Sequence, residues 1–365
     1  MAKKTVPTSK LPTIVQVVES FGGGVFQSAS QLCNGLQGEA NFVIVHDIRA
    51  ETPENYAASF PVGTKFIHLT MGRSISLKDL SRALQLRNAL LKLKPTIVHA
   101  HSSKAGALTR MALLFTGIPR YYSPRGYGFL MANSSFQKRA VYWLAERLLG
   151  FLPGTTIACG HDELKSAKQV SLRAIAIPNG IDPASVPAAS RKRPAFKNIL
   201  QVVSSGRISP QKNFPLFCRI AASFVGQPVQ FTWIGGGDIP PEASVPSNVT
   251  ITGWLPHAKS LEQLNKGQVY LHMSGWEGLS RIVLEAMAHG FPLILSNIPG
   301  NRELGSAGNA FLCTTQTEAE NAINRFLANP KLISEMGTAS HAHLNNAYNW
   351  NHSLQTWRHV YGLAS

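Results

Sequence analysis

Two glutamates eight positions apart carry the strongest chemical signal in the sequence. Glu277 lies in a glycine-containing loop after an apolar strand pattern, over the expected cleft, and Glu285 lies about two turns into a helix expected to begin near Leu279. A carboxylate at either place can accept hydrogen bonds from neighbouring hydroxyls of a ribose or a hexose. Backbone N–H groups near Gly278, Leu279 and Ser280 would meet phosphate or sugar oxygens there. A single glutamate would fit an ordinary helix start equally well.

A cationic loop gives the second signal. Arg207 and Lys212 flank a tight turn that follows one apolar strand pattern and opens a helix. Arginine presents a planar fork of donors and lysine a point charge, a combination that suits a departing diphosphate. Alone, the segment would also fit a solvated basic loop.

Glycine-rich turns follow other strand patterns. Gly23 and Gly24 belong to a run between a strand and a helix, where the backbone can approach a phosphate or sugar closely. The run is neither GxGxxG nor a P-loop, and a simple tight turn remains the alternative. Gly253 and Leu255 flank Trp254 in a segment that suits a nucleobase. Trp254 would equally fit a core.

Polar residues of the first half form a weaker group. His101 comes directly after a strand, in the expected cleft, whereas His99 is expected to point to the opposite face and to lie in the core. Arg125 lies in a Pro-Arg-Gly turn after another strand. Each of the three has an ordinary structural role as its alternative.

The sequence favours neither a metal site nor a bound cofactor. It contains no DxD, no HExxH and no clustered Cys/His ligands. We therefore expect a metal-independent site, in which Arg207, Lys212 and a helix N-terminus neutralise the leaving group.

Strand and helix patterns alternate along the chain and then restart. This order predicts α/β units with parallel sheets covered on both faces, and ligands beyond the carboxyl ends of the strands. A Pro-, Ala- and Ser-rich stretch ending in basic residues near 191–194 indicates the linker between two domains. The last amphipathic helix pattern, near 353–363, either finishes the second domain or packs against the first.

Charge and composition narrow the partners. The net charge is +16, and the first 180 residues hold 21 of the 35 basic but only 9 of the 19 acidic side chains. A basic half attracts anionic partners such as a phosphorylated substrate, acidic lipid or nucleic acid, or it simply keeps the protein soluble. No helix-turn-helix, zinc-finger or RNP-type signature supports nucleic acid. Four dispersed cysteines, no membrane-spanning run and no signal-peptide pattern predict a cytoplasmic protein.

Over nearly its whole length the chain resembles family 4 of the glycosyltransferases, a retaining group with the GT-B fold. The segments that carry the resemblance are the E-x7-E stretch from Glu277 to Glu285 with its continuation to Pro292, Gly206-Arg207 with Lys212, Asn179 to Asp182, and the early glycine run. The resemblance implies two Rossmann-like domains whose parallel sheets face a central cleft. It implies an acceptor-side domain at 1–185, a donor domain at 186–349, and a final helix at about 350–365 that packs back on the first domain.

The resemblance also implies roles for residues. In such enzymes the counterpart of Glu285 holds the ribose, that of Glu277 faces the transferred sugar, and those of Arg207 and Lys212 grip the diphosphate. A glycine of the early run contacts the donor. Many relatives have a histidine where this chain has Arg125, which cannot act as a base; an acceptor anion or the departing diphosphate is its expected partner.

The expected activity is retaining transfer from a UDP- or GDP-sugar to a glycan or lipid-linked acceptor, in bacterial polysaccharide or lipopolysaccharide synthesis. Peripheral contact with the anionic inner face of a membrane would suit such an acceptor. A nucleotide-sugar 2-epimerase of the same fold is the alternative, and a nucleic-acid-binding protein is a distant third.

Overall fold

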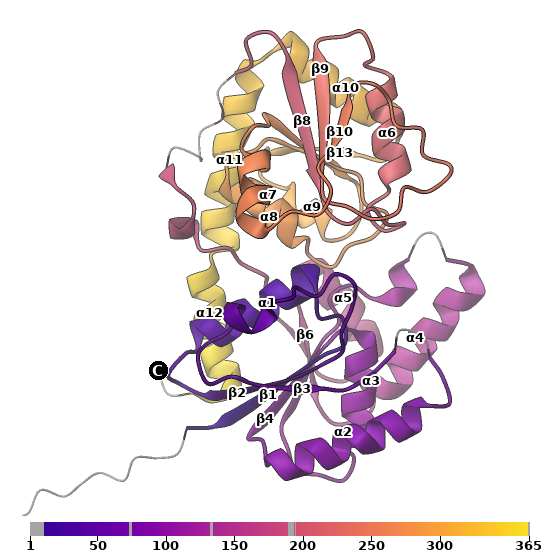
Figure 1. The fold of residues 1–365 in the computed structure, drawn as a ribbon, viewed down its shortest axis with the longest axis vertical. Helices are drawn as coiled ribbons and strands as arrows, with labels where there is room; N and C mark the ends of the chain where they lie inside the picture. The colour runs from indigo at the N-terminus through magenta and orange to yellow at the C-terminus, as the bar shows by residue number, and fades with distance from the viewer. Residues whose placement is uncertain (1–10, 73–74, 132–133, 189–192, 194, 364–365) are drawn as a thin grey trace, which may run out of the picture.

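The chain folds into two α/β units stacked end to end, as Figure 1 shows. The computed structural model describes residues 11–72, 75–131, 134–188, 193 and 195–363. Each unit holds one sheet with helices on both faces, which is the arrangement that alternating strand and helix patterns predict.

Two sheets form the frame, and every neighbouring strand pair within them is parallel. The first contains β1 (Thr13–Val18), β2 (Asn41–His46), β3 (Lys65–His68), β4 (Ile97–His101), β5 (Arg120–Ser123), β6 (Thr155–Ala158) and β7 (Ala174–Ala176), in the order β3-β2-β1-β4-β5-β6-β7. The second contains β8 (Leu200–Ser205), β9 (Val229–Ile234), β10 (Val249–Ile251), β11 (Val269–His272), β12 (Leu293–Ser296) and β13 (Ala310–Cys313), in the order β10-β9-β8-β11-β12-β13.

Helices connect the strands and cover the sheets. Those of the first unit are α1 (Gly23–Gly35), η1 (Tyr56–Ser59), α2 (Asp79–Leu93), α3 (Ser103–Ala112), η2 (Gly128–Leu130), α4 (Phe136–Gly150) and α5 (His161–Val170). From the linker onward they are η3 (Pro183–Ser185), α6 (Phe214–Ala222), α7 (His257–Leu264), α8 (Arg281–Ala288), α9 (Asn301–Leu304), α10 (Gln316–Ala328), α11 (Lys331–Ala347) and α12 (Trp350–Tyr361).

Strand β1 shows how the sequence builds both faces of a sheet. Successive side chains of a strand point to opposite faces. Ile14 and Val18 therefore pack in the core under α1 and α12, whereas Val15 and Val17 pack under α2 and α3. The near-continuous apolar run of this strand reflects burial on both sides.

The sequence pattern does not predict three of the strands, namely β3, β7 and β13. All three lie at sheet edges and have only three or four residues. Edge strands are short and partly exposed, so they lack a long apolar run. Helix α8 begins at Arg281, later than expected, because Ser280 keeps an extended backbone as its N-cap.

Helix α12 lies against the first unit although it comes last in the sequence (Figure 1, yellow). Leu354, Trp357 and Tyr361 belong to the core cluster of the first sheet. The Arg358 guanidinium pairs with the Glu39 carboxylate of the first unit at 2.8 Å. The buried apolar side of this helix therefore ties the chain end to the first unit.

Candidate active site

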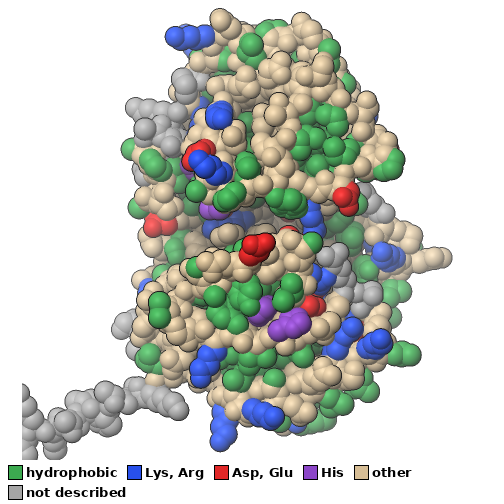
Figure 2. Space-filling view, viewed as in Figure 1, with side chains coloured by type: hydrophobic (Ala, Val, Ile, Leu, Met, Phe, Trp, Pro, Cys, Tyr) green, Lys and Arg blue, Asp and Glu red, His purple; other side chains and the backbone are tan. Residues whose placement is uncertain are grey.

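The carboxyl ends of the two sheets face each other across a groove between the units (Figures 1 and 2). Side chains from both units meet there. Arg207 Nη1 lies 2.7 Å from a carboxylate oxygen of Glu51, and Arg281 Nη1 donates to Gln31 Oε1 at 2.6 Å. One contact between loops and one between helices α1 and α8 therefore join the two units at this groove.

Glu277 is the centre of a buried polar cluster rather than an open carboxylate over the groove. Only 8% of the residue is exposed. Its Oε1 accepts a hydrogen bond from Lys212 Nζ at 2.6 Å and lies 3.1 Å from His272 Nε2, while Oε2 accepts from Gln211 Nε2 at 3.4 Å. The expectation that Glu277 lies open over the groove is therefore wrong. Its buried carboxylate instead holds the Lys212 ammonium in place.

The electrostatics of this cluster keep Glu277 ionised. Burial opposes its ionisation, but the Lys212 charge and the contact with His272 outweigh burial and lower the pKa of Glu277 to about 2. Burial, and then the Lys212 charge, lower the pKa of His272. The cluster therefore contains a charged Lys–Glu pair beside a neutral imidazole.

Arg207 stands at the groove with its side chain 48% exposed. It follows Gly206, whose φ of +136° suits only glycine and whose missing side chain leaves room beside Lys212 and Ile282. The Arg207 side of this ion pair is open to solvent, whereas the Glu51 side chain is only 15% exposed, so a bound anion could compete with Glu51 for the guanidinium.

Glu285 lies one turn into α8, with its side chain 17% exposed. Its nearest cation is Arg281, whose Nε lies 3.5 Å from Glu285 Oε1. Arg207, Lys212, Glu277 and Glu285 thus all gather at the ends of β8 and β11 and the start of α8.

The turn before α8 is closed by the first unit. Gly278, Leu279 and Ser280 are all buried, and a Cβ on Gly278 would meet the backbone of Gly126 at 3.0 Å. Asn179 Nδ2 donates to the Leu279 carbonyl at 3.1 Å. This turn therefore serves as a contact between the units in this structure.

Two glycine-containing loops beside the groove are more exposed than the buried turn before α8. A Cβ on Gly23 or Gly24 would meet no heavy atom within 4 Å, so the start of α1 leaves room for a ligand. Across the second sheet, Gly253 pairs with Gly235 through an isolated bridge, and Leu255 is half-buried. Trp254 is 60% exposed, so it is not a core aromatic residue.

The two histidines of β4 do not lie as expected. His99 and His101 are two residues apart, and a strand places such residues on the same face. Their rings lie tilted at 37° to each other with centroids 4.1 Å apart, and both residues are completely buried. Burial holds the pKa of both imidazoles well below the usual range. The expectation that His101 faces the groove and His99 the opposite side is therefore wrong.

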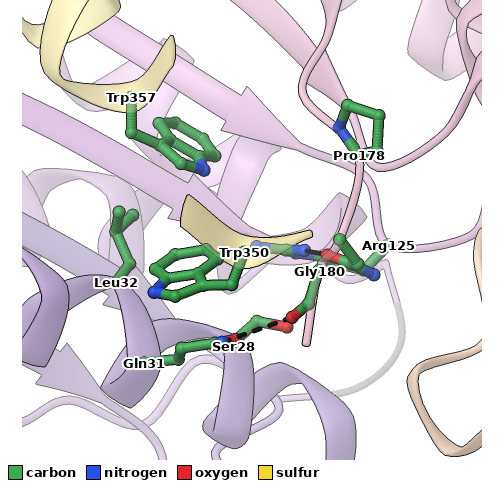
Figure 3. A pocket seen from close by; sticks show the side chains of 9 residues that line it. Ser28, Gln31, Leu32, Arg125, Pro178, Gly180, Trp350 and Trp357 are labelled. Atoms are coloured by element: carbon green, nitrogen blue, oxygen red, sulfur yellow. Dashed lines mark hydrogen bonds between the residues drawn. The ribbon is translucent and has the colours of Figure 1, made fainter. Parts of the chain in front are cut away.

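Arg125 reaches inward instead of toward the groove. Its Nη1 donates to Asn179 Oδ1 at 2.6 Å, and its Nη2 lies 3.3 Å from His101 Nδ1. Figure 3 shows the guanidinium beside Gly180 at a cavity of about 10 Å³, which Trp350 and Trp357 also line. Arg125 therefore holds the Asn179 side chain, and Asn179 in turn contacts the Leu279 loop of the second unit.

Sequence reasoning did not single out His272, Asn179, Glu51 or Arg281 as functional residues. His272 ends a strand two residues before the Glu277 loop, and Asn179 lies in a segment that the resemblance includes. The contacts of Glu51 with Arg207 and of Arg281 with Gln31 could not be predicted locally, because each joins one unit to the other.

Two family models match the chain, one on each unit. Residues 23–180 match the "Glycosyl transferase 4-like domain", and residues 200–329 match "Glycosyl transferases group 1". The chain belongs to this glycosyltransferase family. Its two parallel-sheet units form the GT-B fold.

One relative agrees with this family, and solved structures share the fold. Over 259 residues, covering 64% of this chain and 66% of the relative, so just under two thirds of its length, the chain is 29% identical to the UDP-Gal:alpha-D-GlcNAc-diphosphoundecaprenol alpha-1,3-galactosyltransferase of Escherichia coli. Sucrose-phosphate synthase from Thermosynechococcus elongatus has a similar fold, with a TM-score of 0.78, 18% identity and coverage of 96% and 98% of the two chains. Anabaena HepE in complex with UDP and glucose follows at a TM-score of 0.75, 16% identity and coverage of 96% and 99%.

Metal-ligand clusters and membrane-spanning helices are both absent from the described part of the chain. Within those residues the glycosyltransferase has no group of three or more His, Cys, Asp or Glu side chains arranged to hold a metal ion. Among the helices that the structure describes, none combines the length and apolar character needed to cross a bilayer.

Glu303 is a second carboxylate that contacts across the two units, after Glu51. Glu303 Oε2 accepts the backbone N–H groups of His161 at 2.8 Å and Asp162 at 3.2 Å, at the start of α5. Burial, helped by the negative charges of Asp162 and Glu163, outweighs these bonds and raises the pKa of Glu303 to about 7.

This raised pKa predicts a pH-dependent contribution to stability. The folded state keeps the Glu303 proton up to about pH 7, whereas the unfolded chain releases it near pH 4.5. The contribution is therefore complete below pH 4.5 and disappears as the pH rises to about 7. We expect the difference in unfolding free energy between the wild type and Glu303→Gln to fall by roughly 1–3 kcal/mol from pH 4.5 to 8, in denaturant titrations. The exposed Glu262→Gln is the control, and a constant difference for Glu303→Gln would contradict the assignment.

Proposed function

We propose that this glycosyltransferase moves a sugar, with retention at the anomeric carbon, from a UDP- or GDP-sugar to a glycan or lipid-linked acceptor in bacterial polysaccharide or lipopolysaccharide assembly. The observation that carries the proposal is the gathering of Arg207, Lys212, Glu277 and Glu285 opposite the open start of α1. The two cations match a diphosphate and the Glu285 carboxylate matches the hydroxyls of an adjoining sugar, while Glu277 holds Lys212 in place.

In the proposed reaction, the bond between the anomeric carbon and the diphosphate oxygen breaks, and its electron pair stays on the diphosphate. The acceptor hydroxyl forms the new bond on the same face and gives its proton to the departing phosphate oxygen. Lys212 has three donors, so it can hold Glu277 and still meet the phosphate. Arg207 supplies a second cation once it leaves its exposed pair with Glu51.

This route assigns no protein base, which fits a buried His101 with a lowered pKa and an Arg125 that stays charged. We propose that Glu285 holds the ribose and that Gly23 or Gly24 approaches the donor. In this proposal Gly253 and Leu255 border the base, and the turn from Gly278 to Ser280 reaches the donor only if the units separate slightly.

The relatives support the donor and acceptor classes. The name of the Escherichia coli relative specifies UDP-Gal and a diphosphoundecaprenol acceptor, and Anabaena HepE was solved with UDP. An acceptor on a lipid carrier would bring this protein to the inner face of a membrane. The matched families and relatives are glycosyltransferases, so the comparisons do not favour the epimerase.

The donor site is tested by Glu285→Ala, with turnover of UDP- and GDP-sugars as the readout. Loss of a carboxylate that holds two hydroxyls should lower kcat/KM by roughly 10- to 100-fold, mainly through KM. The exposed Glu262→Ala serves as the matched control. Near-normal turnover in Glu285→Ala would refute the donor-site assignment.

We further propose that no metal is needed, so activity should survive excess EDTA. Retention at the anomeric carbon is tested by NMR, which identifies the anomer of the product.

A further inference from the structure

Helix α4 presents large apolar side chains to solvent. Among the described residues, six exposed hydrophobic side chains lie on this helix or directly after it: Phe136, Val141, Trp143, Leu144, Leu148 and Phe151. Phe136 is 84% exposed and Leu148 is 60% exposed. Their spacing along the helix places all six on one side, at 3.6 residues per turn. We call this set the α4 surface.

Basic side chains lie beside the α4 surface, and the acidic side chain of the helix is buried away from it. Lys138 Nζ lies 5.8 Å from the centre of the Tyr142 ring, and the Arg147 guanidinium lies 4.5 Å from the centre of the Phe151 ring. The acidic residue of α4, Glu146, is buried, where it accepts a hydrogen bond from the Tyr122 hydroxyl at 2.8 Å. The exposed side of the helix is therefore apolar and positively charged.

The surface continues past the end of α4. Leu172 is exposed and its backbone N–H donates to the Gly150 carbonyl, so it lies next to the helix end. Arg173 and Lys168 are exposed beside it and add further positive charge. Exposed apolar side chains of the second unit, such as Val225 and Ile239, lie in separate segments of the chain.

Position links the α4 surface to the proposed active site. The helix follows the loop after β5, whose carboxyl end faces the second unit, and Figure 1 shows it on the outer side of the first unit. An acceptor held by a lipid carrier at this surface would have its sugar close to the groove.

We propose that the α4 surface inserts into the headgroup region of an anionic lipid bilayer; the link to a lipid-linked acceptor rests on the function proposed above. Bulky apolar side chains with a tryptophan enter the interface, while flanking lysines and arginines reach anionic headgroups. A protein partner would need acidic groups and a matching apolar surface, whereas an anionic bilayer supplies both as a continuous layer.

Vesicle binding tests this proposal without donor or acceptor. The full chain is mixed with vesicles of phosphatidylglycerol and phosphatidylcholine in equal parts, or of phosphatidylcholine alone, and the bound fraction is measured by sedimentation at low and high salt. We expect binding to the anionic vesicles that weakens with salt. Absence of binding at low salt would overturn the proposal.

Paired variants locate the binding. Leu144→Ser/Leu148→Ser should lower the partition coefficient at least about tenfold, and Lys138→Gln/Arg147→Gln about fivefold for each lost cation. The controls Val225→Ser/Ile239→Ser and Lys266→Gln/Lys331→Gln change exposed residues of the second unit and should bind as the wild type does. Thermal unfolding confirms that each variant is folded. Unchanged binding of both α4 variants would contradict the proposal.

Two further readouts distinguish insertion into lipid from self-association of the chain. A blue shift of tryptophan fluorescence on binding should be lost in Trp143→Phe, which keeps the surface apolar. If sedimentation velocity shows a wild-type dimer that Leu144→Ser/Leu148→Ser converts to a monomer, the surface joins two copies and the proposal fails. Binding of UDP and GDP measured by calorimetry without vesicles tests the donor site independently, so the two proposals can fail separately.

Discussion

Replacing Lys212 with methionine is expected to lower donor turnover by about 10²- to 10³-fold, chiefly in kcat. Lys212 is the partly buried cation of the proposed diphosphate site, and a preorganised charge that meets developing negative charge contributes about this much. Methionine keeps most of the side-chain length and removes the charge. Lys266→Met, at an exposed position of the same unit, is the control.

The matching measurement is steady-state hydrolysis or transfer with a UDP- or GDP-sugar. A kcat within a few-fold of the wild-type value would mean that Lys212 only supports Glu277 structurally. Combining Lys212→Met with Glu277→Gln separates these roles, because two residues that act as one pair give strongly non-additive effects.

Glu277→Gln is expected to reduce both turnover and stability. Glutamine retains the shape of the side chain but leaves the Lys212 charge without its anionic partner, 16% exposed at the groove. Breaking a buried pair on one side costs about 3–5 kcal/mol, and we expect a loss of this order or less at pH 7, measured by denaturant unfolding. Turnover should fall at least about tenfold because Lys212 loses its fixed position.

The pH dependence of this variant carries a definite sign. The pKa of Glu277 is lowered to about 2 in the folded state, against about 4.5 ordinarily. Its stabilising contribution is therefore present above pH 4.5 and is lost as the pH falls toward 2. The stability gap between wild type and Glu277→Gln should shrink by roughly 3 kcal/mol over that interval. A gap that stays constant or widens in acid would contradict the ionised pair.

The buried histidines show why part of the site could not be placed from sequence. The sequence pattern ends the strand before His101 and so predicts a polar loop residue at the groove, whereas His101 is the last residue of β4. In the structure its Nε2 lies 2.6 Å from Gln16 Oε1, and His99 Nδ1 lies 2.7 Å from the Tyr361 hydroxyl. Tyr361 comes from α12, 262 positions along the chain, so no local pattern around His99 could reveal that this face of β4 is covered.

Local sequence was sufficient for the alternation of strands and helices and for the restart of the pattern in a second unit. These features depend on apolar runs, glycine turns and helical spacing within short windows, so they can be predicted without knowing the contacts between distant residues.

Tertiary structure decided which polar groups are open and which are buried. It turned Glu277 into the partner of Lys212, drew Arg125 inward to Asn179, and set Glu51 against Arg207. Each of these contacts joins segments far apart in sequence. The charge state and exposure of a side chain depend on all elements packed around it, and only the assembled units supply that environment.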